Sequence, residues 1–161
     1  MEVRTEMKKR PMKLCFCSSS GGHYWELLQL KYLANKYDSF CITEKMIFNM
    51  ENLCEKTYYL PQVNRKMLIS IVLFFVILIK SFFILIKERP SHVISSGAFF
   101  TYPIMMLGKL FGAKILFFEL LARTSSKSLT GKLVYPFADL FIVQWNSMLK
   151  LYPKAKLGRV L

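Results

Sequence analysis

Glycine, proline and cysteine are scarce in this sequence, and acidic residues are few. The 161 residues include 7 glycines, 6 prolines and 4 cysteines, with 10 acidic residues against 23 basic ones. The low glycine and proline counts exclude fibrous and low-complexity proteins, and 53% hydrophobic residues exclude a disordered chain. The length fits one domain with a proper core, whereas a two-domain enzyme would need roughly twice as much chain.

The few cysteines form no CxxC pair and have no histidine at zinc-ligand spacing. We therefore expect no metal site. We also expect no cofactor. Cys15 and Cys17 are two residues apart in an apolar run, so on a strand they would face the same side. The sequence predicts buried free thiols in a reducing compartment. The four cysteines are Cys15, Cys17, Cys41 and Cys54.

The formal charge of +13 is concentrated in the second half of the chain. Residues 1–63 carry 9 basic and 7 acidic residues, residues 64–89 carry 5 and 1, and residues 90–161 carry 9 and 2. Such an excess suits an anionic partner: nucleic acid, acidic lipid or a phosphorylated substrate. The high apolar content favours the membrane. The basic residues are dispersed without a recognition motif, so we expect no nucleic-acid partner, and a stand-alone nucleotide- or nucleic-acid-binding module is the weaker alternative.

Short apolar runs alternate with helical patterns along residues 12–161. Helices are expected after a glycine turn at residue 22, with Trp25, Leu28, Tyr32 and Leu33 on one face, and near 44–53, 64–88, 101–112, 128–137 and 146–151. This alternation predicts an α/β fold, a Rossmann-like parallel sheet with helices on both faces and ligands at the carboxyl ends of the strands. The expected strands are Met12–Cys17, Ser39–Thr43, Thr57–Leu60, Val93–Ser96, Ile115–Phe118 and Leu140–Gln144.

Residues 1–11 are charged and lack an apolar core, so we expect a polar tail and no signal peptide. The strongest apolar segment lies in mid-chain, where 17 of the residues 67–86 are apolar. As a helix it would be about 30 Å long, enough to cross a bilayer. A single crossing would, however, separate the strands before it from those after it.

On a helical wheel, the polar residues of 66–88 share one narrow sector. We therefore expect the helix at about 64–88 to lie in the membrane interface with its basic residues towards the headgroups. A spanning helix and an ordinary core helix remain as alternatives. The expected membrane contacts are Lys66, Phe74, Phe75, Lys80, Phe82, Phe83 and Lys87.

Three polar loops should meet at the carboxyl edge of the predicted sheet. The first joins a strand to a helix through Ser20, Gly21 and Gly22, whose backbone amides would bind an anion, and His23 follows as a candidate general base. A tight turn without a ligand, and a capping or surface histidine, are the ordinary alternatives. The other candidates for phosphate or sugar contacts are Ser96, Gly97, Glu119, Arg123, Ser128 and Thr130. A solvated loop in which Ser128 or Thr130 caps a helix explains the last loop equally well.

Four motifs carry a family resemblance: Ser19–His23, Ser96–Gly97, Glu119–Arg123, and Ser128–Trp145 with a following Tyr152-Pro-Lys-Ala. Together they resemble the bacterial PssD polysaccharide-biosynthesis proteins, which are similar to the eukaryotic asparagine-linked glycosylation protein 14. The resemblance runs from about Lys13 to Gly158. It implies the acceptor-side Rossmann-like half of a GT-B glycosyltransferase, equivalent to its N-terminal domain.

The resemblance also implies a membrane-attached subunit on the cytoplasmic face. A PssE-type partner would bind the UDP-sugar, and the acceptor would be a polyprenyl-diphosphate-linked sugar of capsule or exopolysaccharide assembly. The glycine backbone would then bind the diphosphate, His23 would activate the acceptor hydroxyl, and Glu119 would hold the acceptor sugar or serve as the alternative base. Arg123 would neutralise phosphate. The competing interpretation within the family is a non-catalytic enhancer of its partner, with a partner surface near residues 145–161.

Overall fold

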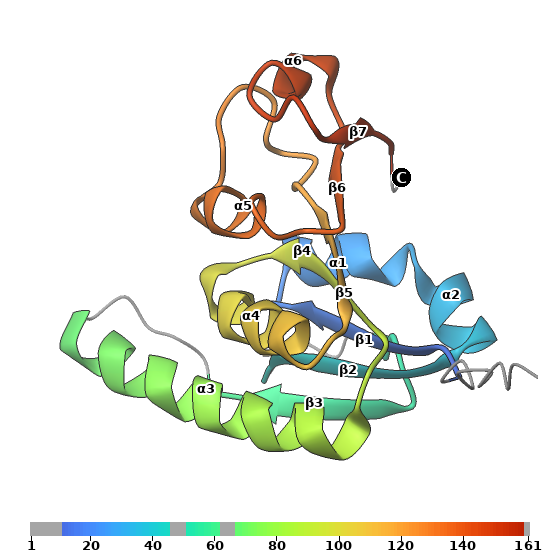
Figure 1. The fold of residues 1–161 in the computed structure, drawn as a ribbon, viewed down its shortest axis with the longest axis vertical. Coiled ribbons are helices and arrows are strands. Elements are labelled where there is room, and N and C mark those ends of the chain that lie inside the picture. Colours follow the sequence, from blue (N-terminus) through green and yellow to red (C-terminus); the bar gives the residue numbers. More distant parts are fainter. Residues whose placement is uncertain (1–10, 46–50, 62–66, 160–161) are drawn as a thin grey trace, which may run out of the picture.

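The computed structural model describes residues 11–45, 51–61 and 67–159. The strands in these residues form one seven-stranded parallel sheet. The strand order is β3-β2-β1-β4-β5-β6-β7, with parallel pairing throughout (Figure 1). The strands are β1 Lys13–Ser18, β2 Asp38–Glu44, β3 Lys56–Leu60, β4 His92–Gly97, β5 Lys114–Phe118, β6 Leu140–Val143 and β7 Lys156–Leu157. The Rossmann-like arrangement expected from the sequence is confirmed.

Helices cover both faces of the sheet (Figure 1). The helices α1 and α2 pack on one face, whereas α3, α4 and α5 pack on the other. The helices are α1 Gly22–Leu28, α2 Lys31–Lys36, α3 Met67–Glu88, α4 Tyr102–Leu110, α5 Leu129–Val134 and α6 Asn146–Leu149, and the 3₁₀ helix η1 spans Phe99–Thr101.

Alternate residues of each strand supply the two halves of the core. Cys15 and Cys17 face the α3 and α4 side, while Cys41 and Cys54 lie in the cluster beneath α1 and α2. All four cysteines are free and buried, as predicted. Burial raises the pKa of Cys17 to about 12, so its thiol stays protonated and behaves as a small apolar group.

The helix predicted near residues 44–53 is wrong where the structure describes that segment. Glu44 ends β2, residues 46–50 lie outside the described part of the chain, and residues 51–55 form no helix. The Tyr24 hydroxyl replaces the helical hydrogen bonds, because it donates to the Glu51 carbonyl at 3.1 Å and accepts from the Leu53 amide at 3.0 Å. Leu53 is thereby buried in a non-helical segment.

Two further elements differ from the prediction. The first helix is divided between Leu28 and Lys31. Trp25 and Tyr32 are exposed, and Tyr24 and Leu27 form the buried face instead. Strand β7 has only two residues, both exposed, and no apolar run in the sequence predicts it. It is recognisable only from its pairing with β6.

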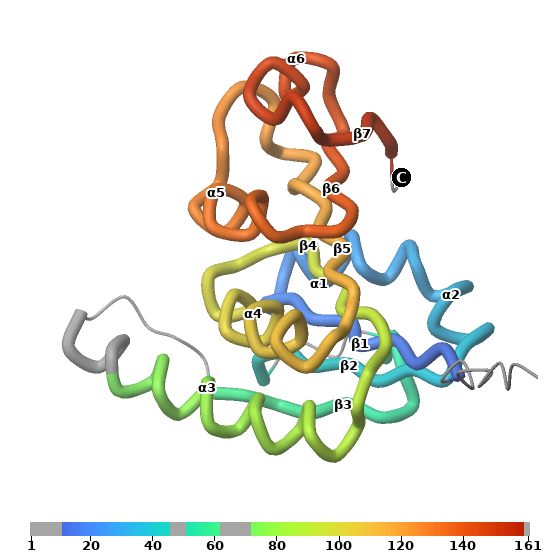
Figure 2. The backbone as a smooth tube through the Cα atoms, in the orientation of Figure 1, coloured from blue at the N-terminus to red at the C-terminus, as the bar shows by residue number. Residues whose placement is uncertain are grey.

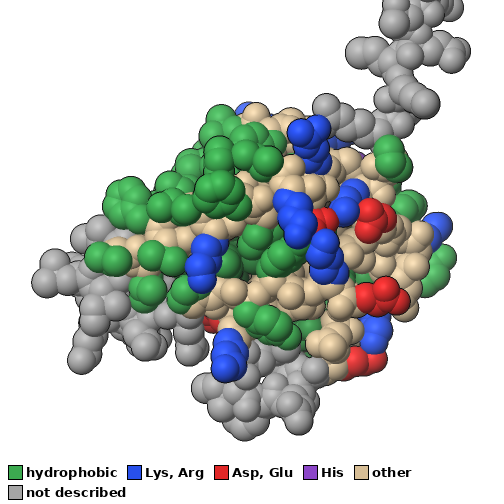
Figure 3. Space-filling view, turned by 90° about the horizontal axis from the view of Figure 1, so that it is seen from below, with side chains coloured by type: hydrophobic (Ala, Val, Ile, Leu, Met, Phe, Trp, Pro, Cys, Tyr) green, Lys and Arg blue, Asp and Glu red, His purple; other side chains and the backbone are tan. Residues whose placement is uncertain are grey.

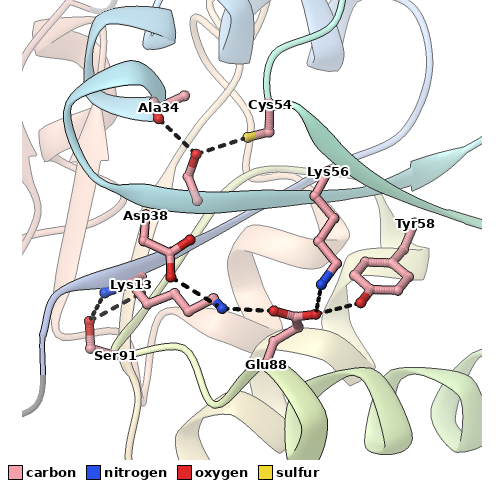
Figure 4. Close-up of polar contacts among 9 residues, drawn as sticks. Lys13, Ala34, Asp38, Cys54, Lys56, Tyr58, Glu88 and Ser91 are labelled. Atoms are coloured by element: carbon pink, nitrogen blue, oxygen red, sulfur yellow. Dashed lines mark hydrogen bonds and ion pairs between the residues drawn. The ribbon is translucent and has the colours of Figure 1, made fainter.

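A buried carboxylate joins the end of α3 to the amino edge of the sheet (Figure 4). Glu88 contacts Lys13 of β1 at 2.8 Å, and it also pairs with Lys56 and accepts a hydrogen bond from the Tyr58 hydroxyl, both on β3. Burial by itself would raise the pKa of Glu88, but these partners lower it to about 2. The helix is thus fixed at its carboxyl end, far along the sheet from α6 and β7 (Figure 2).

Candidate functional site

The candidate site lies at the carboxyl edge of the sheet, where the chain order reverses between β1 and β4. These strands are neighbours, and Ser18 at the end of β1 pairs with Gly97 at the end of β4. Loops leave such a switch point in opposite directions, which makes it the usual ligand position of an open α/β sheet. The loops predicted to carry chemistry after β1 and β4 therefore meet.

His23 joins these two loops by direct hydrogen bonds. Its Nδ1 lies 2.8 Å from the Ser96 carbonyl oxygen, and the Ser96 hydroxyl donates to the His23 carbonyl at 2.8 Å. A carbonyl can only accept, so Nδ1 carries the proton and Nε2 of the neutral ring keeps its lone pair. Burial lowers the pKa of His23, although the Ser96 carbonyl and the Glu119 charge oppose this effect. The ring is accordingly neutral at pH 7, the form that a general base requires.

The two glycine turns beside His23 have backbone conformations that suit glycine. Gly21 has φ of 85° and Gly97 has φ of 109°. A Cβ at Gly97 would lie 3.2 Å from Cε1 of His23, whereas the Cβ positions of Gly21 and Gly22 are open. Gly97 thus allows the imidazole to pack closely, and Gly21 and Gly22 are exposed, which leaves room for a ligand beside their backbone.

Glu119, which directly follows β5, is buried instead of open to a substrate. Glu119 is only 2% exposed. Its Oε2 accepts from the Tyr152 hydroxyl at 2.9 Å and from the Ser128 amide at 3.4 Å. A Cβ at Gly131 would lie 2.6 Å from that hydroxyl, so α5 packs tightly on this pair. Glu119 therefore links the loop after β5 to α5 and to the C-terminal segment.

Sequence reasoning missed a second buried carboxylate, Glu26 on α1. Its Oε1 accepts from the Leu121 amide at 2.8 Å, and its Oε2 accepts from the Gln144 side chain at 3.0 Å. Gln144 also donates to the Glu119 carbonyl at 3.1 Å. Glu26 thus holds the loop after β5 against the helix that carries His23. A single glutamate in an amphipathic helix normally indicates a solvated face, so only the three-dimensional structure identifies it.

The remaining predicted residues after β5 divide into exposed and buried ones. Arg123 is exposed, and its guanidinium donates to the Ser126 hydroxyl at 3.3 Å. Ser128 caps α5 by accepting from the Gly131 amide at 2.9 Å, and Thr130 is buried. The capping alternative thus describes Ser128, and the charged side chain of Arg123 faces solvent. Among the described residues, no cluster of His, Cys, Asp and Glu side chains could hold a metal ion.

The carboxyl ends of β6 and β7 border a surface pocket of about 510 Å³. Trp145 and Arg159 line it, and the guanidinium of Arg159 lies 5.7 Å from the indole ring. The Trp145 Nε1 also donates to the Leu121 carbonyl at 2.7 Å. The segment predicted as a partner surface therefore adjoins the candidate site.

The outward face of α3 is apolar, which corrects the expected orientation of this helix. Ser81 and Glu88 were expected on a polar stripe facing headgroups, but both are buried against the protein. The sheet anchors Glu88, so the helix turns its other side outwards, and Lys80 and Lys87 lie at the border as exposed residues. The outward apolar face consists of Val72, Phe75, Ile79, Phe82, Phe83 and Ile86.

Figure 3 views the molecule from the α3 side and shows hydrophobic side chains gathered there, with lysine and arginine side chains among and beside them. Phe74 is partly buried, and Lys66 lies outside the described residues. Of the helices in residues 11–45, 51–61 and 67–159, none has both the length and the apolar content needed to cross a bilayer.

Comparison with known proteins places these features in a family. Residues 57–160 match the family described as "Oligosaccharide biosynthesis protein Alg14 like". The UDP-N-acetylglucosamine transferase subunit ALG14 of Mus musculus is 29% identical over 184 aligned positions, which cover 94% of this chain and 84% of the mouse protein. The subunit of the same name from Kluyveromyces lactis is 55% identical over 49 residues, which cover 30% of this chain and only 21% of that protein.

Solved structures show the same fold at low sequence identity. The MurG protein of Acinetobacter baumannii superposes with a TM-score of 0.68 at 14% identity, covering 85% of this chain and 43% of MurG. The UDP-N-acetylglucosamine 2-epimerase of Rickettsia bellii gives 0.69 at 12% identity, covering 92% of this chain and 43% of the epimerase. The chain thus spans less than half of either protein and corresponds to one Rossmann-like half of the GT-B architecture. By its sequence match, this chain belongs to the Alg14-like family of oligosaccharide biosynthesis proteins.

Proposed function

We propose that this protein is the acceptor-binding, membrane-attached subunit of a two-component UDP-sugar glycosyltransferase. The observation that carries the proposal is that an Alg14-like chain forms one half of a GT-B fold, with its candidate site at the carboxyl edge of the sheet. A second polypeptide would supply the donor half. Since relatives are named UDP-N-acetylglucosamine transferase subunits, UDP-N-acetylglucosamine is the first donor to test. The motifs resembling PssD favour a PssE-type partner and a capsule or exopolysaccharide product.

The acceptor is a sugar linked through a diphosphate to a polyprenyl chain. The accessible amides of Gly21 and Gly22, with Ser20 beside them, bind the diphosphate, and Ser96 and Gly97 complete that side of the site. Backbone N–H groups at the start of a helix are suited to bind such an anion. The exposed guanidinium of Arg123 neutralises phosphate from the opposite loop.

His23 is the general base of the proposed transfer. Its Nδ1 proton is fixed on the Ser96 carbonyl, so Nε2 accepts the proton of the acceptor hydroxyl as that oxygen attacks the anomeric carbon of the donor sugar. The bond from that carbon to the UDP oxygen breaks at the same time, and UDP leaves on the partner. The burial of Glu119 favours a positioning role for it over its alternative role as the base.

The protein attaches to the cytoplasmic face of the membrane through the outward apolar face of α3. An exposed apolar stripe bordered by lysines is the pattern of a helix that lies in the bilayer interface. Lys80 and Lys87 would then meet the headgroups, while Phe75, Phe82 and Phe83 enter the acyl region.

Donor binding tests the division of labour. We expect this chain alone to bind no UDP-sugar in isothermal titration and its complex with the partner to bind UDP-N-acetylglucosamine. Tight UDP binding by the isolated chain would instead support a stand-alone nucleotide-binding module. Transfer by the partner alone, merely increased by this chain, would make the protein an enhancer and remove His23 from the mechanism.

A further inference from the structure

Three aromatic rings from neighbouring elements stack in series beside the candidate site. Phe74 of α3 stacks on Phe99 of η1, with ring centroids 6.0 Å apart and an interplanar angle of 28°. Phe99 stacks in turn on Tyr102 of α4, at 6.4 Å and 10°. Phe99 is 44% exposed, so this series is open to solvent. We refer to Phe74, Phe99 and Tyr102 as the aromatic track.

The aromatic track connects the outward apolar face of α3 with the polar turn at His23. At one end, the Phe74 ring meets the Phe75 ring of that face edge to face, with ring centroids 6.0 Å apart. Phe99, the middle ring of the series, is two residues beyond Gly97, which packs against the imidazole of His23. Helix α5 also contacts η1 and exposes Leu129 and Leu133. Between Phe99 and Gly97, the surface thus changes from an apolar ring to the polar turn beside His23.

Buried hydroxyl groups fix the turn that presents Phe99. Gly97 and Ala98 both have positive φ, and at 71° the value for Ala98 is unfavourable for a residue with a side chain. The Thr101 hydroxyl lies within donating distance of the carbonyls of both residues, at 3.1 and 2.8 Å, and accepts from the Ser95 hydroxyl at 3.2 Å. Such backbone strain persists only where the surroundings enforce it. The position of Phe99 is therefore preorganised.

We propose that the aromatic track binds the isoprenoid chain of the acceptor next to its diphosphate, an inference that rests on the proposed function. A polyprenyl diphosphate joins an apolar chain directly to a doubly charged group, which is the same sequence of polarity as this surface. When the diphosphate leaves the headgroup layer to reach His23, the first isoprene units would otherwise be exposed to water. Aromatic side chains can shield such units from water, and they lose little conformational freedom in doing so because they have few rotatable bonds.

The test compares a diphosphate with and without a chain, in detergent and without the partner. Geranylgeranyl diphosphate and inorganic pyrophosphate are titrated into the wild type, Phe99→Ala and the control Phe111→Ala. Phe111 is 42% exposed and contacts Phe82 of α3, much as Phe99 contacts Phe74, but it lies beyond the other end of α4. We expect tighter binding of the chain-bearing probe by the wild type. Phe99→Ala should weaken that binding by about fivefold or more and leave pyrophosphate binding unchanged, and Phe111→Ala should change neither.

The outcomes separate this inference from the proposed function. Equal binding of both probes by the wild type, or equal losses in the two variants, would overturn the aromatic track while leaving the diphosphate site in place. Binding of neither probe would contradict the diphosphate site itself. Phe99→Leu, which keeps an apolar side chain, should retain most of the preference for the chain, and unchanged thermal unfolding of each variant shows that the fold persists.

Discussion

His23 is the residue whose surroundings most directly suggest catalysis. In His23→Ala, we expect the rate of sugar transfer by the complex to fall about 10²–10³-fold, because proton removal from the acceptor hydroxyl loses its base. Co-purification with the partner and sedimentation with liposomes should be unchanged. A rate within about twofold of the wild type would remove His23 from the mechanism.

The same residue predicts the pH dependence of transfer. Only the neutral imidazole accepts a proton, and burial lowers the pKa of His23 below its ordinary value of 6.5. The wild-type rate should therefore be constant above that value and fall as the pH drops below it. The residual rate of His23→Ala should lack this acidic limb, and a limb that persists would assign the titration to another group.

Glu26 holds the loop after β5 against α1, and we expect it to help position the site. Glu26→Gln replaces one accepting oxygen with a donor, so either the Leu121 amide or the Gln144 side chain loses its hydrogen bond to residue 26. We expect the free energy of unfolding to fall by about 1–3 kcal/mol and the KM for the lipid acceptor to rise more than kcat falls. The exposed Glu55→Gln serves as the control and should stay within about 0.5 kcal/mol. Unaltered unfolding and KM in Glu26→Gln would contradict this role.

The sequence predicted the position of individual site residues only where they lie in a turn between a strand and a helix. Gly21, Gly22 and His23 follow a strand and precede a helix, so their place at the carboxyl edge was predictable. The burial of Glu119 and the role of Glu26 were not, because they depend on partners such as Tyr152 that are distant in the chain. Long-range hydrogen bonds of single polar residues leave no periodic signal.

At the scale of the element, α3 is the feature that membrane experiments test. The double change Phe75→Asp with Phe83→Asp places two charges on the outward apolar face, both side chains being more than half exposed. We expect binding to liposomes containing anionic lipid to fall at least tenfold in a flotation assay, since charged groups do not enter the acyl region. The matched control Trp25→Asp with Tyr32→Asp alters exposed aromatics on the opposite face of the sheet and should bind normally. Equal loss in both pairs would contradict an orientation set by α3.

The anchor of α3 predicts an acid-sensitive stability. The pKa of Glu88 is about 2 in the folded protein, well below its ordinary value, so the ionised group stabilises the fold above that ordinary value. This contribution, about 3 kcal/mol, should disappear as the pH falls from about 5 towards 2. Urea unfolding of wild type and Glu88→Gln should differ most at pH 7 and converge at low pH. A difference that is independent of pH would show that ionisation of Glu88 does not matter.

Most elements were predictable because their apolar runs are long enough to show a period. The first six strands and α3 to α6 lie where the patterns indicated, although several helices are shorter than expected. The failures have specific causes: hydrogen bonds from Tyr24, distant in the chain, hold residues 51–53 in a non-helical form, and β7 is too short to carry a pattern. The side of α3 that faces outwards depends on the ion pairs of Glu88, which the helical wheel does not contain.

At the scale of the whole molecule, the fold is one half of a two-part architecture. Its carboxyl edge combines the candidate site, the exposed Arg123 loop and the Trp145 pocket, while the apolar face of α3 lies on one side of the sheet. A donor half placed over this edge would close the site without covering the membrane face. The aromatic track would then lead the acceptor chain from the bilayer to the catalytic edge.

The most direct measurement is sugar transfer from labelled UDP-N-acetylglucosamine to a polyprenyl-diphosphate-linked sugar in proteoliposomes. Three preparations are compared: this protein alone, its partner alone, and both together. The split-transferase account predicts product only with both proteins and its loss when the first carries His23→Ala. Comparable product from the partner alone, or full activity with His23→Ala, would contradict it.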